Sequence, residues 1–88
     1  MDFKIKDNLI YLGNEDNPDA YIKYTVEDGI MSINSTVVKK EMGGQGIAGK
    51  LTDRAVEFAR EEGYKIKPIC SYAVRYFEKK PELKELLA

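Results

Sequence analysis

The chain has 88 residues, and its 14 basic and 15 acidic side chains give a formal net charge of −1. These values predict one small domain over residues 1–88 and argue against a nucleic-acid partner, and no apolar run is long enough to cross a membrane. Histidine is absent and Cys70 is the only cysteine, which excludes the commonest general base and an internal disulfide.

The first part of the chain reads as four consecutive strands. Alternating apolar and charged residues predict strands over 3–7 and 9–14, joined by a turn at Asp7 and Asn8. A third strand is predicted to begin at Ala20, with hairpin-type turns in "NEDNPDA" and "EDG" on its two sides. In a fourth strand over 30–38, strict alternation predicts one face made of Ile30, Ser32, Asn34 and Thr36, and another made of Met31, Ile33, Ser35 and Val37.

The second part reads as helix, strand and helix. Residues 47–62 carry apolar side chains at helical spacing, and Gly63 supplies a C-cap. "YKIKPIC" predicts a short strand whose Pro68 leaves part of one edge unpaired. "SYAVRYFEKK" predicts a last helix, capped by Ser71 and ended by Pro81.

The stretch "KKEMGGQGIAGKLTDRA" imitates two nucleotide-binding signatures. Gly44, Gly46 and Gly49 satisfy G-x-G-x-x-G, but a dinucleotide site needs its first glycine directly after a buried strand and further βαβ units behind it. The pattern G-x-x-x-x-G-K ends at Lys50, yet Leu51 stands where a Mg²⁺-binding Ser or Thr belongs. Both interpretations are therefore rejected. The remaining ones are a loop whose backbone N–H groups approach an anion at a helix start, and a plain strand-to-helix turn.

Within this stretch, "GGQGIAGKL" resembles motif A of the GNAT superfamily of acyl-CoA-dependent N-acetyltransferases, from Gly43 through Gly46 to Ala48. The wider span 30–83 is similar to very small GNAT-like proteins, with a helix ending in Glu-Gly, a K-x-x-P-x-C strand and a Tyr/Phe-rich helix running into Pro-Glu. The resemblance implies an α+β protein with a reduced GNAT fold, a mixed and mainly antiparallel sheet of about five strands with two helices. It also implies that acetyl-CoA binds in the cleft between the fourth and fifth strands.

The resemblance further implies a set of cofactor-binding residues, because in this family the loop amides hold the coenzyme A pyrophosphate. The set is Val37, Val38, Gly43, Gly44, Gln45, Gly46, Ile47, Ala48, Gly49, Lys50 and Tyr76. Lys50 and Arg54 lie one helical turn apart near a helix N-terminus, where a phosphate of coenzyme A would compensate their charge. The alternative for this pair is a solvated face with Asp53 and Glu57 nearby.

Three positions depart from the family pattern. Gly43 stands where the motif has Arg or Gln, and Ser35 stands where many small relatives carry a histidine. Larger members often place a general-acid tyrosine where this chain has Phe77, and Tyr76 is one residue away, turned by about 100° on a helix. A histidine-assisted mechanism is therefore excluded.

Cys70 is the candidate catalytic residue. The resemblance places it at the end of the fifth strand, beside the thioester carbonyl of bound acetyl-CoA, and the dipole of the following helix favours a thiolate. Two roles stay open: Cys70 accepts the acetyl group and passes it to an amine, or it lines the tunnel while the amine attacks acetyl-CoA directly. A free cysteine also fits a plain buried position.

The leading function is acetyl transfer from acetyl-CoA to an amine on a small molecule or a protein. The alternative is a catalytically idle module that binds coenzyme A or another protein, favoured by the absent histidine and the displaced tyrosine. Residues 1–13 carry charges where a secretory peptide needs an apolar run, so we expect a cytoplasmic protein with no membrane partner.

Overall fold

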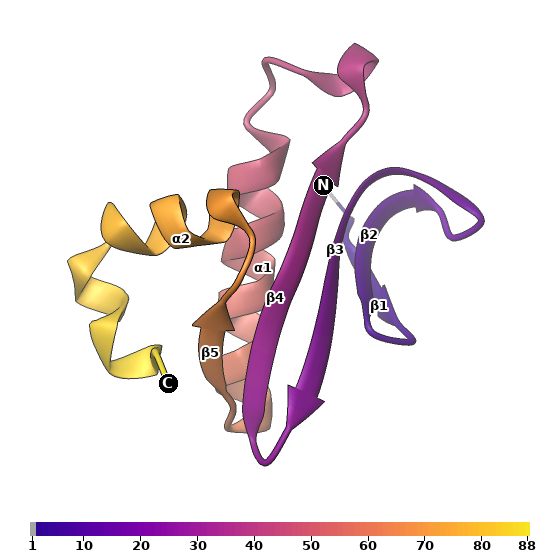
Figure 1. Ribbon diagram of the computed structural model, residues 1–88. Helices are drawn as coiled ribbons and strands as arrows, with labels where there is room; N and C mark the ends of the chain where they lie inside the picture. The colour runs from indigo at the N-terminus through magenta and orange to yellow at the C-terminus, as the bar shows by residue number, and fades with distance from the viewer. Residues whose placement is uncertain (1) are drawn as a thin grey trace.

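The computed structural model describes residues 2–88 and consists of one five-stranded sheet with helices on one face and at one edge (Figure 1). The elements are β1 (Lys4–Lys6), β2 (Leu9–Asn14), β3 (Asn17–Glu27), β4 (Ile30–Val38), the 3₁₀ helix η1 (Lys40–Met42), α1 (Ile47–Glu62), β5 (Lys65–Pro68), α2 (Ser71–Glu78) and the 3₁₀ helix η2 (Pro81–Leu86). The strands lie in chain order, and all neighbours are antiparallel except β4 and β5, which are parallel. The predicted α+β fold with a mixed, mainly antiparallel sheet is confirmed.

Tight turns join the first strands as expected. Asp7 and Asn8 have φ angles of 51° and 65°, and Asp28 and Gly29 have φ angles of 54° and 76°. Positive φ at both central residues is typical of the hairpin turn whose twist matches that of antiparallel strands. The turns predicted at Asp7 and Asn8 and in "EDG" are therefore confirmed.

The third strand begins earlier than predicted. β3 starts at Asn17 rather than at Ala20, so the turn after β2 consists of Glu15 and Asp16. Pro18 pairs with Gly13 where the β2–β3 register shifts. Such an irregularity accommodates a residue that lacks an N–H group, which is why "NPD" lies in a strand although its composition is typical of a turn.

The alternation of β4 changes phase at Asn34. Successive residues of β3 pair with Ser35 and Ile33, so Asn34 is the extra residue of a β-bulge. Ile33 faces α1 before the bulge and Thr36 faces α1 after it, whereas Ser35 and Val37 face the other side. The prediction of strict alternation is therefore wrong beyond Asn34, because a single inserted residue exchanges the two faces.

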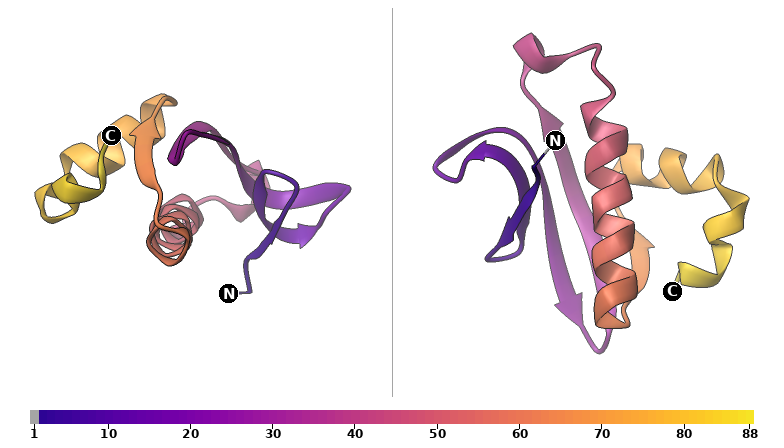
Figure 2. Two further views of the ribbon diagram at one scale, coloured as in Figure 1. Left: turned by 90° about the horizontal axis from the view of Figure 1, so that it is seen from below. Right: turned by 180° about the vertical axis from the view of Figure 1, so that it is seen from behind.

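α1 covers one face of the sheet (Figure 2). Its buried residues recur at helical spacing and are Ile47, Leu51, Thr52, Ala55, Val56 and Ala59. They pack against buried sheet residues that include Ile10, Ile22, Met31, Ile33 and Ile66. Full burial of an aliphatic side chain of this size contributes roughly 1.5–3 kcal/mol, so this layer holds the sheet and α1 together. The predicted C-cap is confirmed, since Gly63 has a φ of 76°.

The start of α2 differs from the prediction by one residue. The N-cap is Cys70 rather than Ser71, and its sulfur accepts the N–H of Ala73 at 3.4 Å. β5 ends at Pro68, so Cys70 lies just beyond the strand instead of at its last position. α2 ends before Pro81, as the missing N–H of proline requires.

The C-terminal segment returns to the sheet. After η2, Leu87 forms a bridge with Ile66, and the N–H of Ala88 donates to the carbonyl of Ile66 at 2.9 Å. The ammonium of Lys65 donates to the carbonyl of Glu85 at 2.5 Å. The sequence patterns predicted no element in this segment.

In residues 2–88, no helix combines the length and the apolar composition that a membrane crossing needs.

Candidate functional site

The loop between β4 and α1 contains two glycines in the left-handed region. Gly44 and Gly46 have φ angles of 80° and 70°, and outside the adjacent residues no heavy atom of the described chain lies within 4 Å of the Cβ that either would carry. Glycine is therefore required at both positions by conformation and not by lack of space. Gly43 has an extended conformation, and its N–H donates to the carbonyl of Lys40 at 3.1 Å. That N–H is engaged within the loop.

The N-terminus of α1 presents free backbone donors. Its N-cap is Gly46, which has no side chain to accept a hydrogen bond, and the first bond of the helix runs from the N–H of Lys50 to the carbonyl of Gly46 at 3.1 Å. The N–H groups of Ile47, Ala48 and Gly49 therefore have no acceptor within the helix. The first turn of α1, as described, holds no acidic side chain that would offset the positive end of the helix dipole. This geometry suits a phosphate.

The β4–β5 ladder ends before β4 itself does. Its last pair is Ile33 with Pro68, and the carbonyl of Ile33 then accepts the N–H groups of both Ile69 and Cys70, at 3.0 and 3.1 Å. From Asn34 onward, β4 has no β5 partner in the described part of the sheet. Figure 1 shows β4 continuing toward the glycine loop while the chain after β5 turns into α2. The two strands diverge there, as expected from the family resemblance.

The Cys70 sulfur lies at this divergence and has two polar contacts. The hydroxyl oxygen of Thr36 is 3.3 Å from Sγ, and the N–H of Ala73 donates to Sγ at 3.4 Å. Cys70 is half-buried and packs against the core. The bulge in β4 is what turns Thr36 toward the sulfur, and it leaves Ser35 on the opposite face of the sheet. A thiolate at Sγ would keep both contacts, since a hydroxyl and an N–H can each donate to it.

A cavity of about 360 Å³ lies between the first half of α1 and α2. It is lined by Gly49, Asp53, Tyr72, Arg75, Tyr76, Lys79 and Lys80. The hydroxyl of Tyr76 donates to the carboxylate of Asp53 at 2.5 Å, and the Lys80 ammonium lies 5.2 Å from the centre of the Tyr76 ring. The structure thus brings the predicted site residues Gly49 and Tyr76 to one cavity.

The hydroxyl of Tyr76 keeps its proton well above neutral pH. Burial is the main cause that raises the pKa of Tyr76 above its usual value near 10, and the hydrogen bond to Asp53 adds to it. The folded chain then holds this proton more tightly than the unfolded chain. Stability from this group is therefore present at neutral pH and is lost as the pH rises above about 10.

Tyr76→Phe is expected to lessen the alkaline loss of stability. The free energy of unfolding, measured by denaturant titration at several pH values above about 10, should fall less steeply in the variant because it lacks the phenol at position 76, whose pKa folding raises. At neutral pH the lost hydrogen bond should cost about 1 kcal/mol. An identical alkaline decline in Tyr76→Phe and the parent chain would contradict this assignment.

The two basic residues near the start of α1, Lys50 and Arg54, have different surroundings in the structure. The guanidinium of Arg54 lies 2.9 Å from the carboxylate of Glu57 and 3.5 Å from that of Glu61. Of the two carboxylates expected nearby, Glu57 pairs with Arg54, whereas Asp53 accepts the hydroxyl of Tyr76. Lys50 is exposed and makes no ion pair with the residues that the structure describes.

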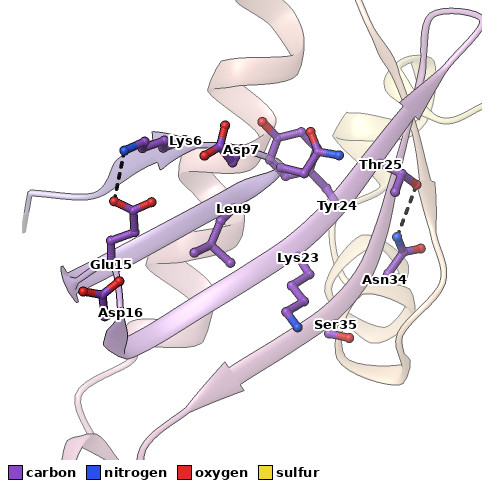
Figure 3. A pocket seen from close by; sticks show the side chains of 11 residues that line it. Lys6, Asp7, Leu9, Glu15, Asp16, Lys23, Tyr24, Thr25, Asn34 and Ser35 are labelled. Atoms are coloured by element: carbon purple, nitrogen blue, oxygen red, sulfur yellow. Dashed lines mark hydrogen bonds and ion pairs between the residues drawn. The ribbon is translucent and has the colours of Figure 1, made fainter.

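A second cavity, of about 480 Å³, lies on the face of the sheet opposite α1 (Figure 3). The strands contribute Leu9, Lys23, Thr25, Asn34 and Ser35, and the turns at the two ends of β2 contribute Asp7, Asn8, Glu15 and Asp16. Lys6 from β1 pairs with Glu15 at 3.2 Å across the hollow. β2 curls enough for the turns at its two ends to border one hollow.

The charge of this second cavity is negative on balance. The hydrogen bond with Glu15 is the main cause that raises the pKa of Lys6, and the ammonium of Lys23 lies 5.8 Å from the centre of the Tyr21 ring. Asp7 and Asp16 make no ion pair within residues 2–88. This charge favours a cationic ligand over an anionic one.

Several residues at these sites escaped the sequence patterns. Thr36 was missed because its contact with Cys70 depends on the bulge. The basic residues of the α1–α2 cavity, in contrast, could have been found from their spacing in the sequence. Arg75 and Lys79 are four residues apart, as are Tyr72 and Tyr76, so each pair lies on one side of a helix. This spacing predicts a basic and aromatic helix face.

Comparisons with known proteins identify the family and a similar fold. The model of a family described as GCN5-related N-acetyl-transferase matches residues 8–86. An NMR solution structure of a GCN5-like protein from Staphylococcus aureus is 36% identical, with a TM-score of 0.80, and the match covers 99% of this chain and 87% of that chain. Among curated proteins, no match is found.

Proposed function

The chain belongs to the GCN5-related N-acetyltransferase family, and on this premise we propose that it transfers the acetyl group of acetyl-CoA to an amine through Cys70. Family membership implies the use of an acyl-CoA donor in general. The choice of acetyl-CoA, the amine acceptor and the covalent role of Cys70 belong to the proposal. So do the assignment of residues 1–88 to one domain and a cytoplasmic location.

The observation that carries the proposal is the position of the Cys70 sulfur. It lies where β4 and β5 diverge, with the hydroxyl of Thr36 and the N–H of Ala73 within 3.3 and 3.4 Å. Both groups can donate to a thiolate and stabilise it. The contact with Ala73 also caps α2, whereas a residue that only fills space or caps a helix needs no contact with Thr36.

Acetyl-CoA supplies an acetyl group that is activated as a thioester, and the residues around the loop fit its anionic part. Donors for the pyrophosphate are the N–H groups of Gly44, Gln45, Gly46, Ile47, Ala48 and Gly49, with the charge of Lys50 beside them. Val37, 41% exposed, and the half-buried Val38 form the free end of β4 between the loop and Cys70. We assign the pantetheine arm to this strand end.

The transfer occurs in two steps, with no histidine required. In the first step the Cys70 thiolate forms a bond to the acetyl carbon while the bond from that carbon to the sulfur of coenzyme A breaks. The released coenzyme A sulfur takes up the proton that Cys70 gave to solvent. In the second step the bound ammonium first loses a proton to solvent. The resulting neutral amine attacks the acetyl carbon, the bond from that carbon to Cys70 breaks, and the second proton lost from nitrogen returns to the Cys70 sulfur.

The acceptor amine is assigned to the second cavity, on the opposite side of the sheet. Ser35 lines that cavity and Thr36, the next residue, contacts the Cys70 sulfur. Since the β4–β5 ladder ends at Ile33, no backbone pairing in the described sheet closes β4 off from β5 at this level. Amines are cations in water, which suits the surplus of carboxylates at Asp7 and Asp16.

Asp7→Asn combined with Asp16→Asn is expected to raise the KM for amine acceptors severalfold while leaving kcat nearly unchanged. The two carboxylates are exposed, so each contributes at most about 1 kcal/mol to binding. The control is Asp28→Asn, in the β3–β4 turn outside this cavity. Steady-state kinetics with a panel of primary amines provides the measurement. If the double variant and the control have the same KM, the acceptor binds elsewhere.

A second candidate function is a module that binds coenzyme A without catalysis, or that binds another protein. It is favoured by the lack of histidine in the chain and by the Tyr76 hydroxyl, which is committed to Asp53. The experiment that separates the two is release of free coenzyme A thiol from acetyl-CoA in the presence of amines. Amine-dependent release supports the transferase, and binding of acetyl-CoA without any release supports the idle module.

A further inference from the structure

The helix α2, whose N-cap is Cys70, is too short to hold a position of its own. It has eight residues, Ser71–Glu78, whereas isolated helices shorter than about 12–15 residues are marginal in water. Its buried residues are Ala73, Tyr76 and Phe77. The orientation of α2, and with it the position of the Cys70 sulfur, is therefore set by contacts with the rest of the chain.

Tyr76 links α2 to α1. Its hydroxyl donates to the carboxylate of Asp53 at 2.5 Å, which is the one side-chain hydrogen bond between the two helices within residues 2–88. Asp53 follows the fully buried Thr52, so the acceptor stands on a part of α1 that is fixed in the core. The Tyr76 ring is 8% exposed and packs edge to face on the Phe77 ring, with 5.0 Å between the centres. A bond to a charged acceptor in such surroundings is stronger than one in water.

The Tyr76–Asp53 bond lies on the side of α2 that holds the Cys70 sulfur. Ala73 donates its N–H to Sγ at 3.4 Å, and Tyr76 follows three residues later, one helical turn away on the same face. A rise of 1.5 Å per residue places Tyr76 about 9 Å along the axis from Cys70. The other contact of Sγ, with the hydroxyl of Thr36 at 3.3 Å, comes from β4. A rotation of α2 against α1 would therefore move Ala73 and the sulfur relative to Thr36.

We propose that Tyr76 and Asp53 are positioning residues for Cys70, and that their hydrogen bond holds α2 where the Ala73 N–H and the Thr36 hydroxyl both reach the sulfur. The inference rests on the proposed nucleophilic role of Cys70. It gives Tyr76 a role other than contact with the cofactor. Without the bond, α2 samples further orientations, the two contacts are made for part of the time, and the thiolate is less stabilised.

The test is the pH profile of Cys70 alkylation by iodoacetamide, measured on the intact chain without acetyl-CoA. Tyr76→Phe keeps the ring and changes no charge at neutral pH, but it removes the donor. The profile should shift toward higher pH, so that alkylation at pH 7 slows by about threefold to tenfold. Tyr64→Phe removes the hydroxyl of another tyrosine that packs against α1, through Phe58, and should keep the parent profile.

Two substitutions of Asp53 isolate the hydrogen bond from the charge. Asp53→Asn and Asp53→Ala both lose the carboxylate charge, but only asparagine keeps an oxygen that can accept the Tyr76 hydroxyl. The profile should therefore lie at higher pH in Asp53→Ala than in Asp53→Asn. Coincident profiles for these two variants would contradict the inference. If Tyr76→Phe does not fold, this pair decides the question.

A further control addresses general loss of stability. Gly63 has a φ of 76° at the C-terminal end of α1, so Gly63→Ala strains the chain far from α2 and should lower the unfolding temperature without moving the profile. A folded Tyr76→Phe variant with the parent profile, or an equal shift in Gly63→Ala, overturns the positioning role. So does a Tyr76→Phe variant that binds coenzyme A more weakly in calorimetry but keeps the parent profile, since Tyr76 would then act on the cofactor.

The proposed function fails on a different observation. A parent chain that forms no acetyl adduct and releases no coenzyme A overturns the acetyl transfer, whereas the alkylation profiles, which need no acetyl-CoA, still show whether Tyr76 and Asp53 control the sulfur. With both intact, Tyr76→Phe should slow formation of the Cys70 adduct as much as it slows alkylation, with the affinity for coenzyme A unchanged.

Discussion

Cys70→Ser is expected to keep the fold and the affinity for coenzyme A while lowering amine acetylation by about two orders of magnitude or more. A serine oxygen can still accept the N–H of Ala73 and bond to Thr36, so the cap of α2 survives. A serine hydroxyl with no base beside it is, however, a poor nucleophile, and the chain contains no histidine. Initial rates of coenzyme A release at saturating amine measure the effect, and calorimetry checks binding.

Cys70→Ala separates the chemical role from the structural one. Alanine removes the sulfur that caps α2, which should lower the free energy of unfolding by about 0.5–2 kcal/mol. Acetylation should fall as far as in Cys70→Ser. In the parent chain, bound coenzyme A should protect Cys70 from alkylation by iodoacetamide. An alanine variant that acetylates amines at the parent rate would show direct transfer from acetyl-CoA, with Cys70 only lining the site.

Gly46→Pro is expected to abolish detectable binding of coenzyme A. Gly46 has a φ of 70°, whereas proline fixes φ near −65° and removes an N–H from the loop, so the donors at the start of α1 lose their alignment. Outside the adjacent residues, no heavy atom of the described chain lies within 4 Å of a Cβ built on Gly46, so we expect the strain of the substitution to stay in the loop. Calorimetry measures the affinity, and circular dichroism checks that the variant is folded.

Two control variants distinguish loop geometry from general strain. Gly46→Ala keeps the N–H group and costs roughly 1–2 kcal/mol of strain, so it should weaken binding less than proline does. Gly29→Ala places the same strain in the β3–β4 turn, where φ is 76°, and should leave binding unchanged. A folded Gly46→Pro variant with the parent affinity would rule out the loop as the pyrophosphate site.

Most of the elements were predictable because their residues repeat with one period. The alternation in β1, β2 and β3 and the helical spacing from Ile47 to Ala59 both report a single buried face, and Gly63 ends α1 as its position predicts. The elements that were not predicted depend on tertiary contacts. η2 packs through Leu86 and leads to the bridge between Leu87 and Ile66, which no local pattern reveals.

The site was predictable to the extent that it depends on backbone conformation. Gly44 and Gly46 are needed for left-handed φ angles, and glycine shows that need directly in a sequence. The contact between Thr36 and Cys70 was hidden because one inserted residue, Asn34, exchanges the faces of β4. The alternation of residues along a strand does not reveal a bulge, so it predicted Thr36 on the face of the sheet opposite Ile33.

Charge placement was predictable only where helical spacing decides the partners. Arg54 and Glu57 are three residues apart on one helix, and their ion pair follows from that spacing. The bond between Tyr76 and Asp53 joins α2 to α1 across 23 positions, and it depends on how the two helices pack. The α1–α2 cavity therefore required the structure.

The most direct test of the central claim is mass spectrometry of the intact chain and of its peptides after incubation with acetyl-CoA alone. We expect one added acetyl group, carried by the peptide that contains Cys70, absent from Cys70→Ser and removed when an acceptor amine is added. An unmodified Cys70 peptide in a chain that nevertheless acetylates amines from acetyl-CoA would contradict it.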